Sequence, residues 1–221
     1  MLHAVEQMTG EVQIFTKGAY KMVKPLKPRT VMYPGMKPFV GNVFGHPEAL
    51  TFPKYFPDLI ESVNLAHGGD ANSMLLRLVM GIVDLGLLSK TKAANLFAWL
   101  ESLNRTQAKR QGDDYPPSIY GYAHGLRHGV QASVGVCLAK DDSNEAMLEQ
   151  ELGMGHITGI PLACGVKLLA NGDITRTGVL APEAGHIDPH AFIDDVFAEL
   201  NKATGQQLGG FDQNVVIVRS W

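Results

Sequence analysis

Segment 156–172 constrains the fold most, because it predicts a helix with a defined start and a defined end. Pro161 suits the first turn of a helix, where no backbone N–H is needed, and Thr158 or Gly159 can cap the helix before it. Apolar residues recur inside the segment at helical spacing, and Asn171-Gly172 offers the left-handed residue that closes many helices. We therefore predict a helix that opens at Thr158-Gly159 and closes at Gly172.

The predicted start of this helix is a candidate anion site. Free backbone N–H groups and the positive end of the helix dipole favour a carboxylate or a phosphate at Thr158 and Gly159. His156 lies just before them and can add to such a site. The alternative is an ordinary helix start, capped by its own threonine and by water.

The composition predicts one globular domain, residues 1–221, and excludes several classes of protein. A net charge of -3 gives no excess of basic residues for a nucleic acid backbone. The two cysteines, Cys137 and Cys164, lie in apolar runs that indicate core positions and no disulfide framework, which suits a reducing cytoplasm. The chain has no signal-like N-terminus and no apolar run of the roughly 18 residues that a membrane span needs.

The N-terminal half predicts strands followed by helices. Residues 11–23 alternate around Lys17-Gly18 and predict a hairpin, and four prolines at 25, 28, 34 and 38 predict an extended surface crossing. Strands are expected at 39–44 and 61–65, with a short helix that begins near Pro47. Two further helices are expected, one over 74–85 that is apolar on most sides and so covered, and one over 91–105 that packs against it.

The C-terminal half predicts more strands than helices. A loop at 111–117 precedes two long strands, 118–125 and 130–140, which form a hairpin buried on one face. Asp188-Pro189 opens a helix that ends at Gly205, and Val215–Val218 forms a last strand. Because strands and helices segregate more than they alternate, we predict an α+β fold with a mixed, largely antiparallel sheet and helices packed on one face.

His46 and Glu48 form the candidate pair that we rank first. An imidazole and a carboxylate at the end of a strand can orient each other or bind a substrate amine. In the alternative interpretation, Glu48 only stabilises the start of a helix and His46 is a surface residue.

Other polar residues give weaker signals. His124 and His128 would share one strand face only in an unbroken strand, which Gly125 and Gly129 disfavour, so we predict no metal site there. Capping and solvation explain His186 and His190. Arg127, near a hairpin tip, can reach a substrate carboxylate or remain solvated. Cys164 is interpreted as a packing residue, and no nucleophile constellation accompanies it.

The order of several motifs resembles the C-terminal region of the saccharopine dehydrogenase family. The matching segments run from about residue 10 to about residue 200, and none is specific alone; they are Gly45-His-Pro-Glu48, Gly86-Leu-Leu88, Thr158-Gly-Ile-Pro161, Thr177-Gly-Val-Leu-Ala-Pro-Glu-Ala184 and Ile187-Asp-Pro189. In that family a dinucleotide-binding domain lies N-terminal to the region that this chain resembles. The chain itself has no G-x-G-x-x-G turn between a strand and a helix, so we predict no cofactor-binding residues within it.

The resemblance implies the substrate-side and dimerisation portion of an oxidoreductase that uses NAD or NADP and acts on an amino-acid secondary amine, as in lysine metabolism. It implies a homodimer, a small amino-acid substrate and a separate dinucleotide-binding domain as partners. Thr158, Gly159, His156, His46 and Glu48 are the expected substrate-binding residues, and catalytic residues are not assigned. The second hypothesis is a free-standing, non-catalytic module for assembly or ligand binding, and a self-sufficient hydrolase or metal enzyme has no constellation to support it.

Overall fold

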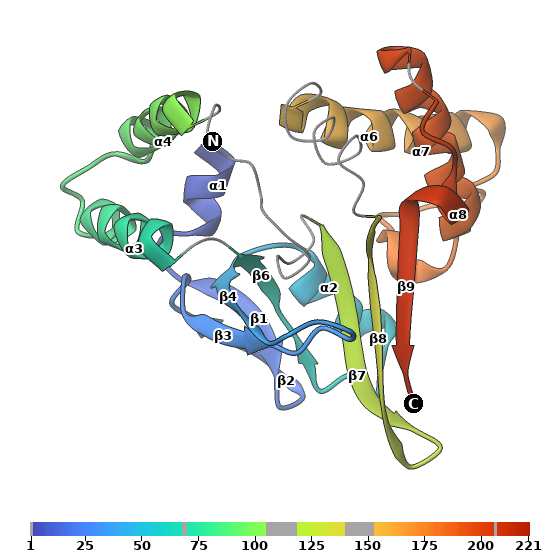
Figure 1. The fold of residues 1–221 in the computed structure, drawn as a ribbon, viewed down its shortest axis with the longest axis horizontal. Helices are drawn as coiled ribbons and strands as arrows, with labels where there is room; N and C mark the ends of the chain where they lie inside the picture. The colour runs from blue at the N-terminus through green and yellow to red at the C-terminus, as the bar shows by residue number, and fades with distance from the viewer. Residues whose placement is uncertain (1, 68–69, 105–118, 140–152, 206) are drawn as a thin grey trace. The chain divides into compact units, whose positions relative to one another are not determined.

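The computed structural model describes residues 2–67, 70–104, 119–139, 153–205 and 207–221 (Figure 1). The described residues form two compact units, and each is treated separately. The first comprises residues 1–32 and 37–115, and the second comprises 33–36 and 116–221. The prediction of a single domain stays a prediction.

The described residues confirm the α+β class, with strands that pair antiparallel. The strands divide among three sheets of three strands each, ordered β2-β1-β5, β3-β4-β6 and β7-β8-β9. None of the described helices has the length and apolar character needed to cross a bilayer.

The first unit holds two of these sheets and the first helices of the chain. Its elements are α1 (Leu2–Gln7), β1 (Val12–Thr16), β2 (Ala19–Val23), β3 (Pro28–Val31), β4 (Phe39–Phe44), α2 (Glu48–Tyr55), β5 (Glu61–Ser62), β6 (Asn64–His67), α3 (Asp70–Asp84) and α4 (Lys90–Asn104). The predicted hairpin is confirmed, since β1 and β2 pair around Lys17 and Gly18, whose φ values of 54° and 75° suit a tight hairpin turn. The predicted strand 39–44 is confirmed as β4.

Two predictions for this unit are wrong. The proline-rich crossing is extended, but it contains the paired strand β3, whose first residue is Pro28. A missing N–H is tolerated at the first residue of a strand and on an edge strand, and Pro28 meets both conditions. Helix α3 is not covered on most sides, because Met74, Leu75 and Leu78 are 77%, 49% and 63% exposed. Its buried face packs with α1 and α4 in a cluster that includes Val79, Met80, Val83, Val5, Ala93 and Ala94.

The second unit holds the third sheet and the C-terminal helices. Its elements are β7 (Tyr120–Arg127), β8 (Val130–Leu138), α6 (Gly153–Asn171), a 3₁₀ turn η2 (Pro182–Ala184), α7 (Pro189–Thr204), α8 (Phe211–Asn214) and β9 (Val215–Ser220). Strand β8 is central, and β9 pairs with it and runs to the C-terminus (Figure 1). The predicted hairpin and last strand are confirmed as paired strands. The expected burial of one hairpin face is not confirmed, because only Tyr120 and Tyr122 of β7 are partly buried and the rest of that strand is exposed. The predicted loop 111–117 lies outside the described residues.

Helix α7 begins and ends where its sequence predicts. The Asp188 carboxylate accepts hydrogen bonds from the backbone N–H groups of His190 and Ala191, at 2.8 Å and 3.3 Å. At the other end, Gly205 takes the left-handed conformation with φ 71°. The buried face of α7 packs on α6 through Cys164, Val196, Phe197 and Leu200.

Candidate functional site

His46 and Glu48 are in direct contact at the corner between β4 and α2. Nδ1 of His46 hydrogen-bonds to Oε2 of Glu48. The amide nitrogen of Asn64, at the start of β6, donates to the same carboxylate oxygen at 3.1 Å, and its amide oxygen accepts from the Ala49 N–H at 3.0 Å. The predicted pair is therefore fixed by an asparagine from a neighbouring strand.

Gly45 brings the chain into this corner. Its N–H donates to the backbone oxygen of Gln7 at 3.0 Å. A Cβ at this position would lie 2.6 Å from the Gln7 side-chain oxygen and 2.8 Å from Cγ1 of Val12, so only glycine fits without displacing them. Pro47 follows at the N-cap of α2 with φ -57°, which proline adopts without strain. The sequence Gly-His-Pro-Glu thus turns the chain directly from strand into helix.

The contact with Glu48 occupies Nδ1 of His46 and leaves Nε2 available to a ligand. A carboxylate can only accept, so Nδ1 of His46 carries the proton in this contact, and Nε2 is a hydrogen-bond acceptor whenever the imidazole is neutral. No described residue pairs with Nε2, and the side chains of His46 and Glu48 are 39% and 42% exposed. An imidazole oriented in this way can accept a hydrogen bond or a proton from a ligand amine.

The predicted anion site at Thr158-Gly159 is wrong in its geometry. Helix α6 already begins at Gly153, so these two residues lie inside the helix, where backbone N–H groups bond to carbonyls four residues earlier. The helix continues through Pro161, whose missing N–H removes one such bond without ending the helix. Thr158, Gly159 and His156 are exposed on α6 and stay predicted substrate-binding residues without the helix-start donors.

The end of this helix is as predicted. Gly172 has φ 81°, and the N–H of Asp173 donates to the Leu168 carbonyl oxygen at 3.0 Å, which closes the last turn. The predicted substrate-binding residues fall into two groups, His46 with Glu48 in the first unit and His156, Thr158 and Gly159 on α6 in the second.

The other histidines considered in the sequence have different local environments. Strand β7 runs through Gly125, contrary to the predicted break, and His124 stacks on Tyr122 while His128 occupies the hairpin turn with φ 53°. His186 Nε2 lies 3.1 Å from Nη1 of Arg176, and the His190 ring packs on Phe211. Within the described ranges, no group of three or more potential ligands could hold a metal ion.

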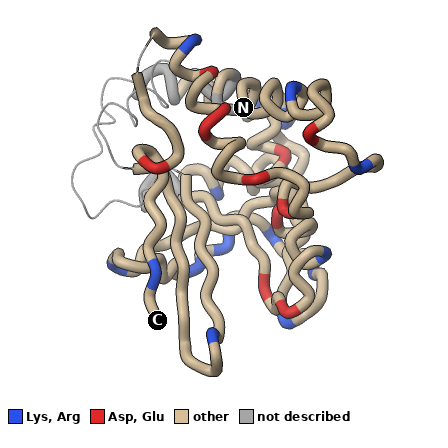
Figure 2. Tube along the Cα trace, turned by 90° about the vertical axis from the view of Figure 1, so that its right-hand side faces the viewer, with Lys and Arg blue, Asp and Glu red and all other residues tan. Residues whose placement is uncertain are grey.

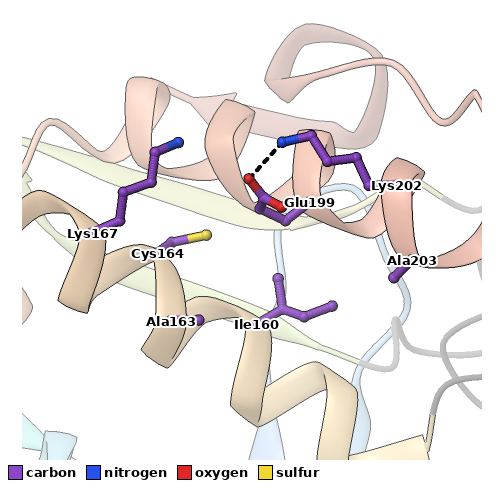
Figure 3. A pocket seen from close by; sticks show the side chains of 7 residues that line it. All are labelled: Ile160, Ala163, Cys164, Lys167, Glu199, Lys202 and Ala203. Carbon is purple, nitrogen blue, oxygen red and sulfur yellow. Dashed lines mark hydrogen bonds and ion pairs between the residues drawn. The ribbon is translucent and has the colours of Figure 1, made fainter.

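An open pocket between α6 and α7 was not predicted (Figure 3). Its volume is about 520 Å³, and its lining residues are Ile160, Ala163, Cys164, Lys167, Glu199, Lys202 and Ala203. The side chains of Cys164, Lys167, Glu199 and Lys202 point toward one another, and Lys202 Nζ lies 2.8 Å from Glu199 Oε1. The spacing of apolar residues in the sequence indicated each helix, but it did not indicate that the two helices pack against each other.

The charged side chains that line this pocket are paired with one another or with a neighbouring carboxylate. Burial raises the pKa of Cys164, and the carboxylates of Asp195 and Glu199 raise it further, so the thiol stays protonated near neutral pH. Lys167 Nζ also has a carboxylate partner, Asp195, at 3.6 Å. A protonated thiol among paired charges is not an activated nucleophile, which agrees with the predicted packing role of Cys164.

No model of a known protein family matches this chain, and no curated protein shows significant similarity to it.

Proposed function

We propose that this chain is the substrate-side and dimerisation portion of an oxidoreductase similar to saccharopine dehydrogenase, acting on an amino-acid secondary amine. NAD or NADP would be bound by a separate dinucleotide-binding domain, and the working form would be a homodimer in the cytoplasm. Two observations support this proposal: the order of the sequence motifs, and the contacts of the Gly45-His-Pro-Glu48 motif.

The observation that carries the proposal is the oriented His46–Glu48 pair. Glu48 holds the Nδ1–H of His46, and Asn64 holds Glu48, so Nε2 is set as an acceptor at an exposed corner. A secondary amine offers an N–H donor when neutral and two when protonated, which suits such an acceptor. In this proposal, His46 binds the substrate amine and takes up its proton.

The same corner does not fit a dinucleotide. A pyrophosphate needs a glycine-rich turn whose backbone it can approach, between a strand and a helix. Here the space beside Gly45 is filled by the side chains of Gln7 and Val12, and Pro47 lacks an N–H. In this proposal, the nicotinamide cofactor is therefore held outside this corner.

Titration of the purified chain with 2-aminoadipate, followed by the imidazole C–H signals in NMR spectra, tests the proposal. We expect the His46 signals to shift with saturation, and Glu48→Gln to weaken binding about tenfold, since a carboxamide holds the imidazole less strongly. His3→Gln is the matched control, because His3 is an exposed histidine of the same unit. Static His46 signals, or equal affinity in Glu48→Gln, would contradict the role of this pair.

A free-standing, non-catalytic module is the alternative, and the missing G-x-G-x-x-G turn favours it. The coding sequence upstream of Met1 separates the two proposals. An in-frame dinucleotide-binding segment supports the oxidoreductase, whereas an upstream stop codon without such a segment supports the module.

A further inference from the structure

Two arginines meet one tryptophan on the third sheet. The guanidinium carbon of Arg127, at the end of β7, lies 4.4 Å from the ring centroid of Trp221, and that of Arg219, in β9, lies 6.0 Å from it. The two guanidinium carbons can therefore be at most 10.4 Å apart, the sum of 4.4 Å and 6.0 Å. Arg127 and Arg219 approach the same ring from the two edge strands of one sheet.

The register of the sheet places both arginines on one face. Arg127 pairs with Val130, and Arg219 pairs with Val134 of the same central strand, four residues along. Because side chains alternate between faces along a strand, residues 130 and 134 share a face, and so do their cross-strand partners. The row between them is lined by Gly125 and Ala132, small residues that leave room above the sheet.

The two positive charges are not neutralised by described residues. Strands β7, β8 and β9 and the turn between the first two contain no aspartate or glutamate. In the described part of the chain, neither guanidinium has a carboxylate within ion-pair distance, and the lower part of the tube that ends at C is tan and blue (Figure 2). Among the described residues, this sheet therefore presents two arginine charges without an aspartate or glutamate partner.

Stacking on an indole leaves the binding edge of a guanidinium available. A guanidinium that faces an indole ring with its flat side keeps its N–H donors in the plane, where they point outward. A planar fork of donors matches the two oxygens of a carboxylate or of a phosphate. Trp221, which is 55% exposed, limits the rotamers of both arginines and so reduces the entropy lost when an anion binds.

We propose that Arg127, Arg219 and Trp221 form a binding site for the oxyanion groups of a small anionic ligand, a carboxylate or a phosphate. A short dicarboxylate can place one carboxylate on each guanidinium, and a phosphate can bind at either one. The residues of this site belong to the second unit and those of the His46–Glu48 corner to the first, and the inference does not depend on the function proposed above.

The test uses Trp221 as the reporter. The chain has two tryptophans, so Trp99→Phe leaves Trp221 as the single source of indole emission and of the indole N–H signal in NMR spectra. This variant is titrated with glutarate and, separately, with inorganic phosphate, at an ionic strength held constant with sodium chloride. We expect a saturable change in emission and in the indole N–H shift with at least one of the two anions.

Variants in the same background assign the response to the guanidinium groups. Arg127→Gln and Arg219→Gln should each raise the Kd at least tenfold, and Arg127→Lys should weaken binding too, since an ammonium has no planar fork. Arg176→Gln is the matched control, because Arg176 is an arginine of the same unit whose guanidinium contacts His186. A response to glutarate alone identifies a carboxylate site, and a response to phosphate alone identifies a phosphate site. Absence of any saturable response in both measurements, or an unchanged Kd in Arg127→Gln and Arg219→Gln, would overturn the proposal.

Discussion

The ring of Tyr33 fills the space that a side chain at position 135 would need. A Cβ on Gly135, in the central strand β8, would lie 2.6 Å from Cζ of Tyr33 and 2.9 Å from its hydroxyl oxygen. Tyr33 is buried and also packs edge-on against Tyr120, with ring centroids 5.7 Å apart. The tyrosine is thus held on two sides and cannot move away without disturbing its neighbours.

Gly135→Ala should therefore destabilise the second unit. Overpacking of a filled site costs about 1–3 kcal/mol, and a rigid aromatic ring places this change in the upper part of that range. Urea denaturation monitored by circular dichroism measures the loss. Gly121→Ala is the matched control, because a Cβ at Gly121, in the neighbouring strand, has no atom within 4 Å. Equal loss in the two variants would show that strand conformation, and not the contact with Tyr33, sets the effect.

Alkaline pH should weaken the same region. Burial raises the pKa of Tyr120 to about 12, above its ordinary value near 10, and burial also raises the pKa of Tyr33. Between pH 10 and pH 12 the unfolded chain has lost these protons while the folded chain keeps them, so the free energy of unfolding must fall as pH rises. Tyr120→Phe should lessen the fall, which urea titrations at pH 9 and pH 11 measure. An unchanged slope in Tyr120→Phe would show that the buried phenol is not responsible.

Removal of the cap of α7 should cost stability. Asp188→Ala takes away the acceptor for two backbone N–H groups, a change that typically costs about 1 kcal/mol. Asp173→Ala removes an exposed aspartate from the same unit, and it should have little effect on the melting temperature. Asp188→Asn should recover most of the loss, since asparagine is also a good cap.

Cys164 should react slowly with alkylating agents. The thiol is buried, and its raised pKa keeps the reactive thiolate scarce at neutral pH. In a Cys137→Ser background, we expect iodoacetamide at pH 8 to label native Cys164 at least tenfold more slowly than the urea-unfolded chain. Comparable rates in the two states would place the thiol in solvent and reopen its role in the pocket between α6 and α7.

The isolated chain should not bind NAD or NADP. The sequence lacks the glycine turn that admits a pyrophosphate, and the β4–α2 corner has no space for one. Calorimetric titration with each cofactor is the measurement. Micromolar affinity for either cofactor would contradict the division of labour that we propose between this chain and a dinucleotide-binding domain.

Local signals in the sequence predicted most elements of the fold. Lys17-Gly18 and Asp188-Pro189 each fix the backbone within a few residues, and the structure has the turn and the helix start there. The predicted start of α6 is wrong because Pro161 suits the first turn of a helix but is also tolerated inside a helix that neighbouring residues support. Strand β3 was not predicted because, in the sequence alone, a proline at the start of a strand cannot be distinguished from a proline in a loop.

The candidate site was predictable only where its parts are adjacent in sequence. The contact between His46 and Glu48 follows from a spacing of two residues at a strand end, but the support from Asn64 depends on how β6 pairs with β4. The cluster of Arg127, Arg219 and Trp221 depends likewise on the register of β7, β8 and β9. Pairing over such sequence separations is set by tertiary packing, which periodicity does not encode.

The assignment of residues 33–36 to the second unit limits how this chain can be divided. A fragment that begins at residue 116 contains β7, β8 and β9 but lacks Tyr33, whose ring covers Gly135. During synthesis, the ribosome releases Tyr33 long before the strand that it covers, so the second unit completes its packing only after both parts have emerged. A gene split at residue 116 would therefore yield a C-terminal product with an unfilled space above Gly135, and addition of a short peptide spanning residues 33–36 would be needed to fill it.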